Sequence, residues 1–327
     1  DMVVEVQDGV GNLETIDSRV LIDTVVDNLA SSGSPEANEN DLVGLNAARD
    51  GMELTGTAEP GAAIEVLLFN ETYTTTADAN GNWSLIVPRG DIPEQEGTVQ
   101  FDVKATDIYG NVDTTTGSVT FDMVAPDTPL ISELAEAASD GYRSVTTRTG
   151  EDDVTIQQVG GDGTISDVSI YDDVSAFTGE TDHFFLDETG QVASIPDGSQ
   201  LIVTNTDDAG NTSSTYVVPA DNVTASLSDL PIGELGGLNI ETVDLRFGDN
   251  SQLVITEDDL LALSQNSDTL VVEGNGSNAE DEGGNKVTMI GANKVDGGAD
   301  EPAGYDIYSL GDDATIVVDE DIQIVTS

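Results

Sequence analysis

The five-residue pattern Asp-x-x-Gly-Asn recurs in the chain, and three of its copies lie at regular intervals, each after a run of alternating apolar residues. These three copies begin at Asp8, Asp107 and Asp207, so they are spaced 99 and 100 residues apart. Aspartate, glycine and asparagine in this order are typical of a tight turn between two strands. A turn that recurs every hundred residues predicts a tandem array of domains, each about the size of an immunoglobulin-like β-sandwich.

The strand after each turn leads into a short acidic segment. Residues 119–130 (VTFDMVAPDTPL) predict a last strand that leaves its domain and enters the next one. Asp23 and Asp27 follow the first turn at the places that Asp122 and, after a slip of one residue, Asp127 occupy after the second. Two prolines stiffen the second segment, because each fixes its own φ angle. These segments are therefore predicted to be domain junctions.

Residues 29–127 carry the clearest signals of a complete domain. A Pro-Gly turn follows Glu59, and residues 78–82 place an Asn-Gly pair at the tip of a hairpin. Trp83 is the only tryptophan, and we expect it to lie in the core rather than to bind a ligand. Strands are predicted at residues 54–58, 63–69, 73–77, 83–87 and 99–106. This spacing predicts an Ig-like β-sandwich.

The remaining chain divides into three further segments in an all-β protein. Residues 1–28 are predicted to be the end of an upstream Ig-like domain, or strands that complete a domain elsewhere in the chain. Residues 128–222 predict a divergent Ig-like β-sandwich. Residues 223–327 predict a final β-rich domain with one short helix, because Thr256 precedes three acidic residues and an apolar run.

The charge of the chain excludes several kinds of partner. Sixty-four acidic and nine basic residues give a formal net charge of −55. Binding to nucleic acid or to anionic lipid requires lysine and arginine, so we expect neither as a partner. Two explanations of the acidity remain open, namely cations bound to the carboxylates and the solubility of a marine or halophilic protein.

Other absences in the sequence bear on location and on how the domains are stabilised. The chain has no cysteine, so metal ions rather than disulfides are expected to staple the domains. No apolar run is long enough to cross a bilayer, so we expect no direct membrane insertion. The first 28 residues lack the pattern of a signal peptide, and the chain looks like a piece of a longer protein.

Calcium is the predicted cofactor, because Ca²⁺ prefers carboxylate, amide and backbone oxygens, which acidic turns beside a strand end supply. At the second junction we group Asp107 and Asn111 with Asp122 and Asp127, and Glu59 is a further candidate. The alternative is that these residues only shape the turns. The predicted metal ligands are Asp8, Asn12, Asp23, Asp27, Glu59, Asp107, Asn111, Asp122, Asp127, Asp207 and Asn211.

The sequence offers little to a catalytic site. It has no cysteine nucleophile and a single histidine, His183, which excludes a site with several histidine ligands for zinc. His183 lies in residues 178–187 (TGETDHFFLD), which predict either a strand with a buried aromatic pair or a binding loop. We therefore predict that the protein is not an enzyme, and an enzyme from a halophile is the least favoured alternative.

Several motifs together resemble the bacterial Ig-like repeats of giant Gram-negative adhesins, of the biofilm-associated and repeats-in-toxin (RTX) kinds. These are the motifs at residues 56–61 (GTAEPG), 78–84 (DANGNWS), 107–111 (DIYGN) and 121–126 (FDMVAP). Residues 253–263, 268–272 and 314–319 resemble a module found near the C-terminal end of such adhesins. Residues 128–222 depart from the pattern, because they lack the Glu-Pro-Gly turn and the Asn-Gly-Asn-Trp hairpin.

The resemblance implies a secreted, extracellular protein held at the cell surface, anchored in the outer membrane through other parts of the protein. It implies cell adhesion and biofilm formation, with calcium stiffening the domain junctions. The expected partners are neighbouring domains of the same adhesin, and we expect a monomer. The alternative is a module within residues 128–327 that binds glycans or peptides of a host or substrate cell. The aromatic-acidic segment at 178–187 and the polar loop at 275–285 motivate it.

Overall fold

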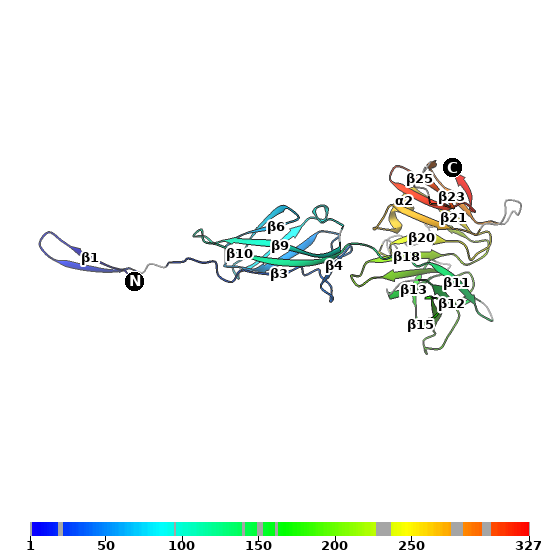
Figure 1. The fold of residues 1–327 in the computed structure, drawn as a ribbon, viewed down its shortest axis with the longest axis horizontal. Coiled ribbons are helices and arrows are strands. Elements are labelled where there is room, and N and C mark those ends of the chain that lie inside the picture. Colours follow the sequence, from blue (N-terminus) through cyan, green and yellow to red (C-terminus); the bar gives the residue numbers. More distant parts are fainter. Residues whose placement is uncertain are drawn as a thin grey trace. The chain divides into compact units, whose positions relative to one another are not determined.

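The computed structural model describes residues 2–18, 22–94, 96–138, 141–148, 153–160, 163–226, 237–275, 284–295 and 302–326. The chain forms two compact units, Asp1–Asp122 and Met123–Ser327. Figure 1 shows strands throughout both, which confirms the predicted all-β class. Among the described residues, no helix is long and apolar enough to span a membrane.

Unit 1 begins with a hairpin of β1 (Met2–Gln7) and β2 (Leu13–Ser18). The two strands form a two-stranded antiparallel sheet of their own. Val3, Val6 and Leu13 are more than half exposed on this hairpin. An isolated hairpin is marginally stable at best. The prediction that this segment completes another domain is compatible with these exposed side chains and stays a prediction.

The rest of unit 1 is a β-sandwich of five and three strands. The larger sheet has the order β4-β10-β9-β6-β7, and the smaller one has the order β3-β5-β8. The strands are β3 (Ala30–Gly33), β4 (Leu42–Gly44), β5 (Met52–Thr57), β6 (Ala63–Leu68), β7 (Glu71–Thr76), β8 (Asn82–Val87), β9 (Glu96–Thr106) and β10 (Val112–Asp122). The strands predicted from alternation all lie within these elements or overlap them.

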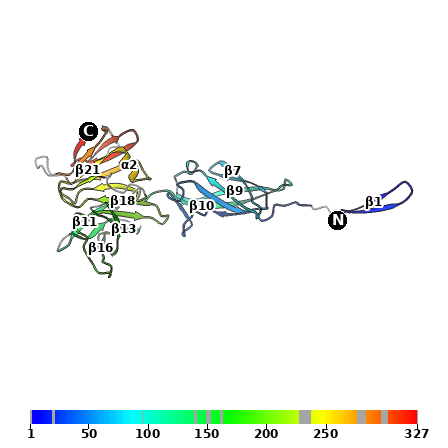
Figure 2. The same cartoon turned by 180° about the vertical axis from the view of Figure 1, so that it is seen from behind.

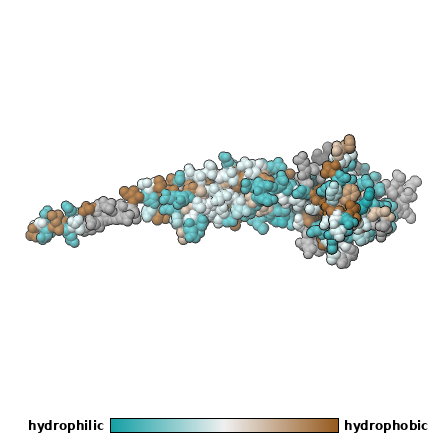
Figure 3. All heavy atoms as spheres, turned by 90° about the horizontal axis from the view of Figure 1, so that it is seen from below, coloured by the Kyte–Doolittle hydropathy of each residue, from teal (hydrophilic) through white to brown (hydrophobic). Residues whose placement is uncertain are grey.

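The core of the sandwich follows from the period of two in its strands. In β6 and in β8 every second residue is buried, so each strand turns one face inward. Trp83 is 2% exposed and donates its indole N–H to the Thr57 carbonyl, which confirms its predicted place in the core. Figure 3 shows that hydrophilic and intermediate residues make up most of the visible surface of the sandwich.

Unit 2 is built on a central nine-stranded sheet, β14-β13-β17-β18-β20-β22-β26-β25-β24. A sheet of four strands, β11-β12-β16-β15, belongs to the same unit. Leu201 and Val203 belong to one core cluster with Val145 and Phe185, whereas Ile202 belongs to the other core cluster. Both faces of the central sheet are therefore covered, which explains the unbroken apolar run in β17.

The bounds of the first strands of unit 2 are as follows. They are β11 (Ile131–Glu136), β12 (Tyr142–Thr147), β13 (Asp153–Val159), β14 (Ile165–Val168), β15 (Ile170–Val174), β16 (Thr181–Phe185), β17 (Gln200–Thr206) and β18 (Thr212–Val217). Two sheets of antiparallel strands enclose one core cluster here. That residues 128–222 are a divergent Ig-like domain stays a prediction.

The C-terminal part of unit 2 is a stack of parallel coils, which the sequence analysis did not predict. β18, β20, β22 and β26 pair in parallel in the central sheet, and β19, β21, β23 and β27 pair in parallel in a second sheet. Each coil contributes one strand to each sheet. The strands are β19 (Thr224–Ser226), β20 (Ile240–Asp244), β21 (Gln252–Ile255), β22 (Thr269–Glu273), β23 (Lys286–Met289), β24 (Ala292–Val295), β25 (Tyr305–Leu310), β26 (Ala314–Asp319) and β27 (Gln323–Thr326).

The predicted boundary at residues 222 and 223 lies within this stack. β18 precedes the boundary and pairs directly with β20, which follows it. In Figure 1 the green strands of the central sheet continue without a break into the yellow ones. Residues 128–222 and 223–327 therefore share one sheet and one compact unit.

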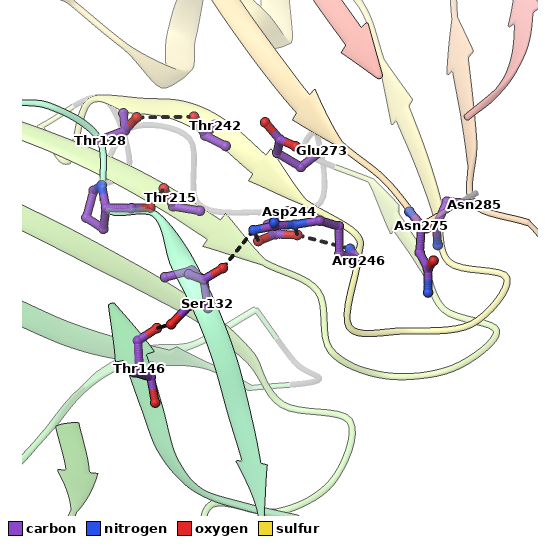
Figure 4. A network of polar contacts seen from close by, with 12 residues as sticks. Thr128, Ser132, Thr146, Thr215, Thr242, Asp244, Arg246, Glu273, Asn275 and Asn285 are labelled. Atoms are coloured by element: carbon purple, nitrogen blue, oxygen red, sulfur yellow. Dashed lines mark hydrogen bonds and ion pairs between the residues drawn. The ribbon is translucent and has the colours of Figure 1, made fainter. Parts of the chain in front are cut away.

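A polar clasp joins the start of unit 2 to the coils. Arg246, just after β20, binds the Asp244 carboxylate through two parallel hydrogen bonds of 2.7 and 3.0 Å. Its guanidinium also donates to the Ile131 carbonyl of β11 at 2.8 Å. Figure 4 shows Arg246 reaching from the coil toward β11. Asp244 is 1% exposed, so Arg246 neutralises a buried charge.

The predicted short helix is present as α2 (Glu257–Leu263), and Figure 2 shows it beside the coils. The Thr256 hydroxyl accepts from the Asp259 backbone N–H, and the Asp259 carboxylate accepts from the Thr256 backbone N–H. This reciprocal pair is a capping box. The acidic residues that follow Thr256 thus have the structural role that their position predicted.

Removing the cap is expected to weaken unit 2 modestly. Thr256→Ala leaves a backbone donor of α2 without its acceptor and should cost about 1 kcal/mol of unfolding free energy. Urea denaturation followed by far-ultraviolet circular dichroism measures the change. Thr256→Ser is the control, since it keeps the hydroxyl and should stay within about 0.5 kcal/mol of the parent protein. Equal losses in the two variants would assign the effect to packing instead of capping.

Candidate metal centre

The Asp-x-x-Gly-Asn turns share one hydrogen-bonding pattern. In the turn between β9 and β10, Asp107 accepts from the backbone N–H groups of Tyr109 and Asn111, both at 2.8 Å. The Asn111 side-chain amide donates to the other carboxylate oxygen of Asp107 at 2.6 Å. Gly110 has a φ of 91°, which favours glycine at this place in the turn.

The other two copies repeat this pattern. Asp8 and Asn12 form it between β1 and β2, and Asp207 and Asn211 form it between β17 and β18. The predicted turn role of these residues is thus confirmed in all three copies. A turn that supplies donors to its own aspartate keeps the carboxylate ionised and in a fixed orientation.

The electrostatics of Asp107 follow from these contacts. Burial alone would raise the pKa of Asp107, but hydrogen bonds from Asn111 and Tyr109 outweigh it and hold the pKa below its ordinary value. In the exposed copy, the Asn12 side chain is the largest cause of the lowered pKa of Asp8. Both carboxylates are therefore anionic at neutral pH.

Three carboxylates converge at the end of the Ig-like sandwich where this turn lies. One carboxylate oxygen each from Asp23, Glu59 and Asp107 lies within 4.8 Å of the others. Asp23 comes from the segment before β3, and Glu59 from the Pro-Gly turn between β5 and β6. Ala63 at the start of β6 pairs with Thr106 at the end of β9, which brings the turns of Glu59 and Asp107 together.

Glu59 has an environment that requires a positive partner. Its Oε2 atom is buried and has no hydrogen-bond partner among the described residues. Burial, followed by the charges of Asp23 and Asp107, raises the pKa of Glu59, and the backbone amide of Asp27 partly offsets this. A buried carboxylate oxygen without a donor is costly, and two further carboxylates beside it increase the cost.

A calcium ion fits this arrangement. The oxygen ligands of Ca²⁺ lie about 2.3–2.6 Å from the ion, so two of them are at most about 5 Å apart. The carboxylate oxygens of Asp23, Glu59 and Asp107 meet this condition. Three carboxylates supply half or fewer of the six to eight oxygens that Ca²⁺ takes, and backbone carbonyls and water would supply the rest.

The structure corrects the predicted grouping around Asp107. Asp122 stands at the far end of β10, whose first residue, Val112, follows the turn of Asp107. Eleven residues of extended strand separate the two by about 30 Å, so Asp107 and Asp122 do not share an ion. The turn of Asp107 instead meets Asp23, in the acidic segment that precedes the sandwich.

The remaining predicted ligands lie elsewhere. Asp8 and Asn12 lie in the β1–β2 turn. Asp127 and Asp207 belong to unit 2, where the Asn211 side chain donates to the Val124 carbonyl and the Asn205 side chain to the Asp127 carbonyl. Within the described residues, Asp23, Glu59 and Asp107 are the one group of three carboxylates this close together.

The single histidine forms a constellation like that of a hydrolase. His183 Nδ1 lies 2.6 Å from an Asp172 carboxylate oxygen, and Nε2 lies 2.9 Å from the Thr147 hydroxyl. Thr147 and His183 are 0% and 1% exposed, so this hydroxyl cannot reach a substrate. The predicted strand is β16, in which Phe185 is buried and Phe184 partly buried. The constellation therefore ties β16 to its neighbours β12 and β15.

Residues 35–127 match the bacterial Ig domain family. The match is to this part of the chain and not to the chain as a whole. Its matched range contains Glu59 and Asp107, whereas Asp23 precedes it. None of the curated proteins compared with the chain gives a significant match.

Three solved structures of adhesins are similar to the chain. A Ca²⁺-stabilised, ice-binding adhesin of an Antarctic bacterium is 23% identical over 65% of this chain and 54% of its own, with a TM-score of 0.36. A 1.5-MDa bacterial ice-binding adhesin is 20% identical over 65% and 70%, with a TM-score of 0.38. A bacterial Ig-like domain of the M. primoryensis ice-binding adhesin is 30% identical over 30% and 97%, with a TM-score of 0.23. The chain thus spans about half the length of the first of these structures.

Proposed function

We propose that the chain is a non-enzymatic segment of a bacterial surface adhesin in which Ca²⁺ fixes the entry of the bacterial Ig domain. Asp23, Glu59 and Asp107 would hold the ion, and Asn111 and Asp27 would orient the carboxylates of Asp107 and Glu59. The observation that carries this proposal is the buried, unpartnered oxygen of Glu59 next to two more carboxylates. The proposal agrees with the description of the Antarctic structure as a Ca²⁺-stabilised adhesin.

The proposed ion would attach the stretch before β3 to the tight turns of the sandwich. Asp23 lies in a stretch without regular structure before β3, whereas Glu59 and Asp107 lie in tight turns of the sandwich. An ion shared by the three would replace their mutual repulsion with attraction and would restrict this stretch. In a repeated array, the same arrangement would stiffen each domain junction. The expected partners are neighbouring domains of the same surface protein, with adhesion and biofilm formation as the outcome.

Calcium titration of the whole chain tests the proposal. Isothermal titration calorimetry is expected to resolve a Ca²⁺ site that Mg²⁺ fills poorly, since Mg²⁺ demands shorter distances and gives up its water reluctantly. Glu59→Gln removes one charged ligand and should weaken this site on the order of tenfold or more. Glu71→Gln, an exposed glutamate of β7 in the same domain, is the matched control and should bind as the parent does. Equal isotherms for the two variants would overturn the proposed site.

A second candidate function, ligand binding within residues 128–327, has partial structural support. The segment at 178–187 is largely the strand β16 and contributes to a core, so it offers no open binding loop. Most of the polar loop at 275–285 lies outside the described residues. A groove at another place in unit 2 is a better candidate.

A further inference from the structure

A groove of about 680 Å³ opens in unit 2 where the sandwich part meets the parallel coils. Its lining includes Tyr142 from the β11–β12 hairpin and Phe247 from the coil after β20. Its volume lies within the range of ordinary ligand sites, about 300–1,000 Å³. Sites of this kind occur preferentially between structural modules.

The groove is held open by backbone contacts. Tyr142 and Ile195 exchange two backbone hydrogen bonds of 2.9 and 3.1 Å, and the Tyr142 hydroxyl donates to the Pro219 carbonyl at 2.9 Å. Gly141 has a φ of 76°, and a Cβ atom there would lie 1.8 Å from the Ile195 carbonyl oxygen. Only glycine fits this position. The tyrosine ring is therefore fixed at both of its ends before any ligand arrives.

The polar side chains that line the groove are almost all hydrogen-bond acceptors. Its charged side chains are the carboxylates of Glu136, Asp197 and Asp221, and none of them forms an ion pair with a described residue. The described lining has no lysine, arginine, histidine, asparagine or glutamine. Its one side-chain donor, the Tyr142 hydroxyl, is already used. The side chains of the described lining therefore present hydrogen-bond acceptors and no free donor.

The three carboxylates all affect the Tyr142 hydroxyl. Burial, and after it the charges of Asp197, Asp221 and Glu136, raises the pKa of Tyr142 to about 12. Three separate chain segments thus direct negative potential at one aromatic ring.

This lining discriminates between classes of ligand. The three carboxylates do not form a group compact enough to coordinate one metal ion, unlike those at Glu59. A saccharide carries no charge, so it would leave the negative charge of the three carboxylates uncompensated. Ammonium and guanidinium groups only donate, and they are also attracted to the faces of aromatic rings. A planar guanidinium combines both properties best.

We propose that this groove binds an arginine side chain of a partner peptide, with its guanidinium against the ring of Tyr142 and its N–H groups on the surrounding carboxylates. The ring of Phe247 already carries the guanidinium of Arg246, 5.6 Å from its centroid. The site is independent of calcium, since the groove lies wholly in unit 2 and the metal centre lies in unit 1. Binding can therefore be tested in EDTA, and its failure leaves the proposed calcium function untouched.

Fluorescence anisotropy of a labelled Gly-Arg-Gly-Arg-Gly peptide tests the proposal with the full chain in EDTA and 0.15 M NaCl. We expect saturable binding of the arginine peptide and none of the peptide in which citrulline, a neutral isostere, replaces arginine. The double variant Glu136→Gln, Asp197→Asn should weaken binding roughly tenfold, since each exposed charge contributes up to about 1 kcal/mol.

A matched control separates a built site from attraction to an acidic protein. Asp153→Asn, Glu188→Gln removes two exposed charges of the same unit outside the groove and should change the affinity less than about twofold. Equal weakening by the two double variants would overturn the proposal. Equal binding of the citrulline peptide, or no binding of the arginine peptide, would do so as well. Circular dichroism of each variant verifies that unit 2 is folded.

Discussion

In EDTA, the β-sandwich of unit 1 is expected to unfold roughly 10–20 °C below its midpoint in millimolar calcium. An ion that binds only the folded state at a hundred times its dissociation constant adds about 2.7 kcal/mol. In a domain of about 100 residues, each kcal/mol shifts the midpoint by about 4–8 °C. The chain has a single tryptophan, Trp83, buried in this domain, so its emission follows the unfolding of unit 1 alone.

Glu59→Gln should separate the two effects of this carboxylate. Without calcium, the variant is expected to be more stable than the parent, because it removes a buried charge that Asp23 and Asp107 repel. With calcium, the variant should show little further increase, since the ion has lost a ligand. Magnesium in place of calcium is the control for ionic strength. Midpoints that do not depend on calcium in the parent protein would mean that the acidity serves solubility alone.

Arg246→Ala is expected to destabilise unit 2 by roughly 3–5 kcal/mol. The substitution leaves the Asp244 carboxylate, which is 1% exposed, without its bidentate partner and removes the hydrogen bond to β11. In a unit of about 200 residues this lowers the unfolding midpoint on the order of 10 °C. Far-ultraviolet circular dichroism measures the change, and the emission of Trp83 should stay the same, because unit 1 is unaffected.

Two variants show whether the cost comes from the orphaned charge. Lys294→Ala breaks the exposed pair between Lys294 and Asp306 in the same unit and should cost about 1 kcal/mol or less. The double variant Asp244→Leu, Arg246→Met removes both charges and should recover most of the stability. If it is no more stable than Arg246→Ala, the clasp acts through its contact with β11 and not through charge neutralisation.

The sequence was most informative where a pattern is local. The alternation in β6 and β8, the cap at Thr256 and the three Asp-x-x-Gly-Asn turns all depend on neighbours within a few residues. Trp83 could be placed in the core because it begins an alternating strand. The structure confirms each of these predictions.

The sequence was least informative where distant segments meet. The repeat links the turn of Asp107 equally well to the acidic segment before its domain and to the one after it. β10 runs along the whole sandwich, and its length separates Asp122 from Asp107. Asp23 is therefore the carboxylate that lies near Asp107. The regular spacing of Asp8, Asp107 and Asp207 could have suggested this choice. Asp23 lies between the turn of Asp8 and the domain that contains Asp107, so it belongs to the junction before that domain.

The parallel coils escaped prediction for a related reason. Apart from the local antiparallel pairs of β24, β25 and β26, their strands pair in parallel, and strands next to each other in the chain belong to different sheets, so each pairs with a distant partner. Short apolar runs of this kind predict a strand but not its partner. The groove beside Tyr142 could not be predicted either, since its lining comes from four separate stretches of chain.

The parallel pairing of β4 with β10 has a mechanical consequence. Leu42–Gly44, near the entry of the β-sandwich of unit 1, lies alongside Thr120–Asp122, at its exit. When the chain is pulled from both ends, these two strands are drawn past each other in opposite directions. Their hydrogen bonds then bear the load together, whereas a hairpin pulled at its open end loses them one at a time. The domain is therefore expected to withstand tension up to a threshold and then to give way all at once.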